Sequence, residues 1–107
     1  MSDIRKRFEE VLARSNPEEG EATVALSYLA SWHLERQSYQ QARKYFGQLL
    51  VRQRSDPDVW ISLCICCATA GETEESEQAL IESVRLLEDP DADVRIIFCR
   101  GLCYVRL

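Results

Sequence analysis

The chain repeats itself with a period of 34 residues, and this repetition limits what it can fold into. Sliding the sequence by that interval places Leu29 on Leu63, and two Asp-Pro boundaries, at Pro57 and Pro90, recur at nearly the same distance. Between the boundaries apolar residues recur with helical spacing, and no long stretch alternates with the period of two that marks a strand. The sequence therefore predicts an all-α fold built from successive helix pairs.

The breaks between the apolar segments set the expected organisation. The first helix stops before Asn16-Pro17, Gly71 is a plausible helix end, and each Asp-Pro boundary closes one element and opens the next. We expect one domain over residues 1–107. It would contain an N-terminal helix (1–15), a first helix pair (23–56), a second helix pair (57–90) and a single helix that begins an incomplete third pair (91–107).

Three of the five cysteines fall in the run CICC at residues 64–67, which raises the question of a metal or redox site. A helix turns by roughly 100° per residue, so the first and last of these cysteines share a face and the middle one points away. Such thiolates cannot converge on one tetrahedral ion. Cys99 and Cys103 could join them from a neighbouring helix, but buried cysteine is also a small hydrophobic side chain. We predict that CICC is core, with no metal and no cofactor.

The sequence contains few other signals of catalysis or ligand binding. The one histidine, His33, falls on a packing position, and isolated glycines form no phosphate-binding loop. A net charge of −5 argues against nucleic acid or an anionic membrane as partner, and no apolar stretch approaches the length of a membrane span. No export signal is recognisable, and five cysteines suit a reducing compartment. We expect a cytoplasmic protein that is not an enzyme.

Small and large side chains recur at fixed places within the helix pairs. In the second pair they occur in both helices, and in the first pair they are clearest in the second helix. The stretches read Trp60-x2-Leu63-Cys64-x2-Cys67-x3-Gly71, Ser76-x3-Leu80 and Tyr39-x2-Ala42-x3-Phe46.

This pattern resembles the tetratricopeptide repeat (TPR) family over about residues 23 to 105. Cys64 and Cys67 stand where the family pattern has Gly and Tyr. The resemblance implies a right-handed array of antiparallel helix pairs, with about two full repeats, whose first helices line a concave groove.

Carried over residue by residue, the resemblance gives a groove of small and apolar side chains suited to an amphipathic helix of a protein partner. Some members of the family bind the C-terminal carboxylate of a partner with a set of basic side chains, and this sequence lacks that set at the equivalent positions. A curled array, in which Ile61 and Ile65 meet the chain's own first helix, is the alternative. The expected groove residues are Val24, Ser27, Ser31, Leu34, Ile61, Ile65 and Ala68.

The last segment is apolar nearly all round, although a terminal repeat helix normally has a polar outer face. Either a following repeat covers it in a longer array, or a second chain does. Phe98 and Leu102 are therefore added to the expected partner-binding residues, and self-association through this segment is expected.

The later half also resembles small chaperones of the type III secretion needle subunit, through Trp60, Leu63-Cys64 and Phe98-x2-Gly101. That resemblance implies a chaperone that holds the amphipathic C-terminal helix of an aggregation-prone subunit, assisted by a small co-chaperone. The alternative function is structural: a fragment or subunit of a larger TPR scaffold.

Overall fold

The computed structural model describes residues 2–14 and 16–106; Met1, Ser15 and Leu107, which belong to the expected end segments, lie outside the described residues. Within those ranges the backbone forms six α-helices, one short 3-10 helix and no strand, which confirms the all-α prediction. Two compact units, residues 1–52 and 53–107, are described separately. The helices are α1 (Ser2–Ala13), α2 (Glu19–Glu35), α3 (Tyr39–Arg52), α4 (Pro57–Ala70), α5 (Thr73–Leu86), η1 (Pro90–Ala92) and α6 (Val94–Arg106).

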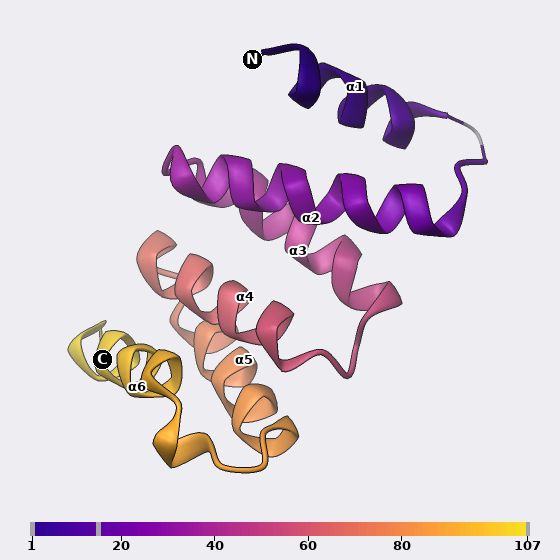
Figure 1. Ribbon diagram of the computed structural model, residues 1–107. Helices are drawn as coiled ribbons and strands as arrows, with labels where there is room; N and C mark the ends of the chain where they lie inside the picture. Colours follow the sequence, from indigo (N-terminus) through magenta and orange to yellow (C-terminus); the bar gives the residue numbers. More distant parts are fainter. Residues whose placement is uncertain (1, 15, 107) are drawn as a thin grey trace. The chain divides into compact units, whose positions relative to one another are not determined.

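In the first unit α2 is the central helix, because both α1 and α3 pack against it (Figure 1). It is apolar on more than one side, which allows it to be covered by two neighbours. Alanines at the contacts let the helices approach closely, while larger side chains fill the space between them. The buried residues are Ala22, Ala25, Leu26, Leu29 and Ala30 in α2, and Ala42, Phe46, Leu49 and Leu50 in α3.

Aromatic and basic side chains join α1 to α2. The rings of Phe8 and Tyr28 lie 4.8 Å apart, and the guanidinium of Arg5 lies 4.7 Å from the ring centre of Trp32. The same ring meets the guanidinium of Arg36, which follows α2 itself, at 4.3 Å. Such cation–π contacts contribute about 0.5–1 kcal/mol each at partly exposed sites. The first helix is therefore held by ring contacts as well as by aliphatic packing.

His33 occupies a packing position, as the sequence indicates. Its ring stacks on Tyr45 at 5.5 Å and meets Trp32 edge-on at 4.9 Å. Its Nδ1 atom is buried without a hydrogen-bond partner. Burial lowers the pKa of His33 below its usual value; the nearby Glu9 raises it by a smaller amount, and Arg5 lowers it further. The neutral ring is the form that this site favours.

In the second unit, local signals define both ends of α4. The Asp56 side chain accepts a hydrogen bond from the backbone N–H of Asp58 at 3.0 Å, and Pro57 occupies the first turn. At the other end Gly71 has a φ of 85°, and the N–H groups of Gly71 and Glu72 return to the carbonyls of Ala68 and Cys67. This is a Schellman motif, in which the left-handed residue is normally glycine.

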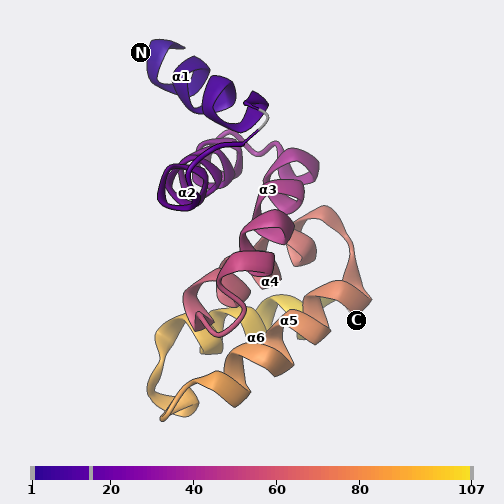
Figure 2. The ribbon, with the colours of Figure 1, turned by 90° about the vertical axis from the view of Figure 1, so that its right-hand side faces the viewer.

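The core of the second unit lies where α4, α5 and α6 meet. Figures 1 and 2 show α6 lying against α4 and α5, with no other helix of this unit on its far side. Partly buried side chains of Trp60, Leu63, Ile65, Leu80, Val84 and Leu87 surround the core. The buried residues of the core are Ile61, Cys64, Ala79, Ile96, Cys99 and Cys103.

The two left-handed helix ends should respond oppositely to substitution. Gln37 follows α2 with a φ of 62°, a conformation that costs a non-glycine residue about 1 kcal/mol or more. Gln37→Gly should therefore stabilise the protein by about 1 kcal/mol, and Gly71→Ala should destabilise it by a similar amount. No atom lies within 4 Å of an added Cβ at Gly71, so that cost would be conformational. Urea unfolding followed by circular dichroism measures both; equal midpoints for the two variants would contradict the assignment.

The packing of His33 should make stability sensitive to acid. Because its pKa is lower in the folded state than in the unfolded chain, the unfolded chain binds the proton more tightly. Stability should therefore be greatest above the unfolded value of about 6.5 and fall as the pH drops towards the folded value. His33→Phe keeps a ring for stacking and removes the proton site. Melting temperatures between about pH 7.5 and 5.5 should fall less steeply in this variant, whereas parallel curves would disprove the contribution of His33.

Candidate protein-binding surface

Helix α6 is apolar on two opposite faces, and only one of them is covered. The covered face carries Ile96 and Cys99, both 0% exposed, together with Cys103. On the other face Val94 is 75%, Ile97 57% and Phe98 51% exposed. Gly101, one turn further along, is exposed as well. We define Val94, Ile97, Phe98 and Gly101 as the outer face of α6.

The covered face is held by small polar side chains as well as by apolar packing. The Cys103 Sγ atom lies 3.2 Å from the Ser76 Oγ atom and 4.0 Å from the Cys64 Sγ atom. Ser76 also donates a hydrogen bond to the Cys64 carbonyl at 3.1 Å, and the Cys99 thiol points to the Ile61 carbonyl at 4.0 Å. These contacts join α6 to α4 and α5, and so fix which face of α6 points outward.

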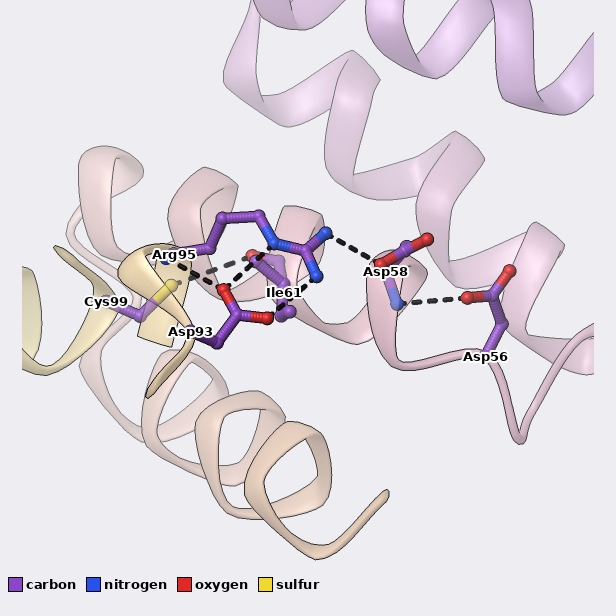
Figure 3. A network of polar contacts seen from close by, with 6 residues as sticks. All are labelled: Asp56, Asp58, Ile61, Asp93, Arg95 and Cys99. Carbon is purple, nitrogen blue, oxygen red and sulfur yellow. Dashed lines mark hydrogen bonds and ion pairs between the residues drawn. The ribbon is translucent and has the colours of Figure 1, made fainter. Parts of the chain in front are cut away.

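A charged network fixes the start of α6 (Figure 3). Asp93 accepts from the backbone N–H of Arg95 at 2.9 Å and from its guanidinium at 2.9 and 3.1 Å. The same guanidinium reaches Asp58 at the start of α4, at 2.6 Å. The bond from Arg95 lowers the pKa of the Asp93 carboxyl, and the two carboxylates raise the pKa of Arg95. Arg95 thereby links the first turns of α4 and α6.

Two of the expected groove residues are not available to a partner. Ile61 is 2% exposed and Ala68 is 1% exposed, so the expectation that both line an open groove is wrong. Ile61 is buried because α6 packs over it, with Ile96 and Cys99 in the same core.

The remaining expected residues of the second unit are less buried than Ile61 and Ala68. Ile65 is partly buried and packs against the core of the unit, and Leu102 is partly buried on α6. Phe98 is half exposed. The apolar core of this unit is thus bordered by Ile65, which is only partly buried.

The expected residues of the first unit all lie on α2. Val24 is 56% exposed, Ser27 and Ser31 are exposed, and Leu34 is partly buried. Their surface is therefore open within that unit, although it is less apolar than the outer face of α6.

The cysteines behave as the sequence predicts for core residues. Cys64, Cys66 and Cys67 lie inside α4 and are 0% exposed, which confirms that CICC is core. Hydrogen bonding to Cys99 and burial raise the pKa of the Cys64 thiol, and burial raises that of Cys103. A thiol with a raised pKa is a poor nucleophile because the reactive thiolate is scarce. Among the described residues, no cluster of three or more potential ligands is arranged to hold a metal ion.

A hollow of about 610 Å³ lies beside α4 and α5. Trp60 and Leu63 form part of its wall, and the indole of Trp60 is fixed by a 2.7 Å hydrogen bond from its Nε1 to the Arg54 carbonyl. Glu74 and Glu77 stand at its edge. The lining thus combines apolar side chains with carboxylates.

The sequence pattern missed two features of this surface. Val94 and Ile97 are more exposed than Phe98, and the sequence signal that indicates them is their position on the helix opposite Ile96 and Cys99. The link from Arg95 to Asp58 joins residues 37 apart in the sequence, and no local pattern indicates such a pair.

None of the helices in the described part of the chain combines the length and apolar character needed to cross a membrane. Comparisons with protein-family models, with curated proteins and with solved structures find no match. The surface itself is therefore the basis for assigning a function.

Proposed function

We propose that this protein is a binding module, a chaperone or adaptor that holds an amphipathic helix of a protein partner on α6 and the adjoining part of α4. The observation that carries the proposal is the outer face of α6, where Val94, Ile97 and Phe98 are each more than half exposed. Apolar residues grouped on one face of a folded protein are characteristic of interaction sites. Binding, without catalysis, is the activity that such a face supports.

A helix is the partner element that suits this surface. The exposed apolar positions on α6 recur at intervals of three and four residues, which is the spacing along one side of a helix. Two helices pack by fitting the ridges of one into the grooves of the other. Ile65 and Leu102, both partly buried, would extend the contact from α6 towards α4.

The arrangement we propose for the chain is a right-handed TPR-like array in the cytoplasm. Two observations support it: α2 packs with α3 and α4 with α5, and the sequence repeats at 34 residues across these pairs. The incomplete third pair would then begin with α6. A needle subunit of type III secretion, with its amphipathic C-terminal helix, is one partner to test. The alternative function, as a fragment or subunit of a larger TPR scaffold, is supported by the same uncovered outer face of α6, which a following repeat would cover.

The test is differential capture from cell extract, with three forms of the full chain as bait. Phe98→Asp places a charge at the centre of the outer face, and the side chain is exposed enough for the fold to accept it. Val51→Asp is the matched control, since Val51 is a 76% exposed apolar residue on α3. A partner should be retained by the wild type and by Val51→Asp, and its affinity for Phe98→Asp should fall about tenfold or more, as for a hot-spot residue.

Circular dichroism would show whether both variants keep their helices. A purified partner that binds Phe98→Asp as tightly as the wild type would disprove the assignment of the outer face. If the partner's bound segment is a strand or an extended peptide, the helix-binding proposal fails even though the face is correct.

A further inference from the structure

Three of the five cysteines, Cys64, Cys99 and Cys103, lie in one buried core where α4, α5 and α6 meet. The sulfur atoms of Cys64 and Cys103 are 4.0 Å apart, and each contacts the Ser76 hydroxyl, at 3.4 and 3.2 Å. A disulfide bond needs two sulfur atoms about 2.05 Å apart, on side chains that meet across the gap. Cys64 and Cys103 meet in this way from two different helices, so a small change of side-chain rotation would bring the two sulfur atoms together.

We propose that Cys64 and Cys103 form a reversible disulfide bond when a small-molecule disulfide oxidises the folded protein, and that this bond holds α6 against α4. The bond would lie on the covered face of α6. It is therefore independent of the partner proposed for the outer face.

Exposure determines which thiol a small oxidant reaches first. Cys103 is 6% exposed, whereas the other four cysteines are 0% exposed. Cys103 also lies towards the end of α6, and helix ends open locally at a lower free-energy cost than the centre of a core. Burial raises the pKa of the Cys103 thiol, so its reactive thiolate is scarce at neutral pH and the first step should be faster at alkaline pH.

Position determines which thiol then reacts with Cys103. Cys99 and Cys103 are four residues apart on one helix, where side chains lie side by side and do not meet across a gap. The Cys99 sulfur points to the Ile61 carbonyl at 4.0 Å (Figure 3). Cys64 projects from the facing helix, so it is the thiol that can reach Cys103 without distortion of α6.

Both steps are thiol–disulfide exchanges, and their atoms and electrons balance. The Cys103 thiolate attacks one sulfur of the oxidant and forms a mixed disulfide, and the other half of the oxidant leaves and takes up the proton that Cys103 has lost. Cys64 then attacks the Cys103 sulfur, and its proton goes to the second half of the oxidant as that half departs. The protein loses two electrons and two protons, and the oxidant becomes two thiols. An excess of small thiol reverses both steps.

The bond would add a second fixed point to α6. Arg95 already links the start of α6 to Asp58 at the start of α4, whereas Cys103 lies towards the other end of α6. A disulfide between residues 39 apart restricts the unfolded chain more than the folded one. We therefore expect oxidation to raise the melting temperature by about 5 °C or more.

The test is oxidation of the full chain with glutathione disulfide at about pH 8.5, where cysteine thiols begin to ionise. Remaining thiols would be blocked with iodoacetamide, and tryptic peptides would be analysed by mass spectrometry. Trypsin cleaves after arginine, so Cys103 falls in peptide 101–106, Cys99 in peptide 96–100 and the three cysteines of CICC in peptide 55–85. We expect peptide 101–106 to be linked to peptide 55–85, with Cys64 identified by fragmentation, and dithiothreitol should separate the two.

The controls separate a bond directed by the fold from chance oxidation. In concentrated urea the shortest loops close most readily, so pairs within CICC and the pair of Cys99 with Cys103 should replace the native bond. Cys99→Ser should keep the link between peptides 101–106 and 55–85. Cys103→Ser should lose the link, and oxidation should no longer raise its melting temperature.

The inference is wrong if peptide 101–106 of the wild type stays unlinked or carries only glutathione. It is also wrong if peptide 55–85 is linked to peptide 96–100 instead, or if the native bond forms equally well in urea. An oxidised protein whose melting temperature is unchanged or lower would show that the bond does not hold α6 in its native place. Peptide mapping of the wild type decides the pairing even where a cysteine variant fails to fold.

Discussion

The close approach of α4, α5 and α6 at three small side chains determines the rest of the second unit. Ser76 lies 3.4 Å from the Cys64 sulfur and 3.2 Å from the Cys103 sulfur, so one hydroxyl links the three helices. Larger side chains at these positions would separate the helices, because protein interiors have little spare volume. The contact also fixes the rotation of α6 about its own axis. Since Cys103 points inward, Val94 and Phe98 point outward, and the exposure of the apolar outer face is a consequence of this packing.

Much of the fold can be predicted from the sequence because its signals are local. Asp-Pro pairs, Gly71 and the apolar spacing mark where helices begin and end, and the observed bounds differ from the expected ones by a few residues. The burial of CICC is also predictable, since consecutive cysteines on a helix diverge and cannot share an ion. The repeat offset indicates the same result, because it places Cys64 at a position equivalent to Ala30, which is 0% exposed.

The candidate surface was harder to predict because it depends on how helices rotate against each other. Helix α6 is apolar on both faces, so periodicity alone does not show which face meets α4. Choosing Ile61 as a groove residue assumed that α6 leaves it open, and the structure has α6 covering it. The link from Arg95 to Asp58 helps to set that position, and it joins distant residues through exposed charges that carry no sequence signal.

The two faces of α6 differ in the size of their side chains, and the larger side chains lie on the uncovered face. The buried face presents two cysteines and Ile96, whereas the uncovered face presents Val94, Ile97 and Phe98. Burying a Val, Ile or Phe side chain is favourable by about 1.5–3 kcal/mol relative to leaving it exposed, so a helix that ends a fold normally turns its larger side chains inward. Rotating α6 to do so would push Phe98 into the space that Cys99 fills beside Ile61, and the close contact with Ser76 would be lost. The small inner face is therefore what the unit needs for its own packing, and the larger apolar side chains of α6 are left on its outer face.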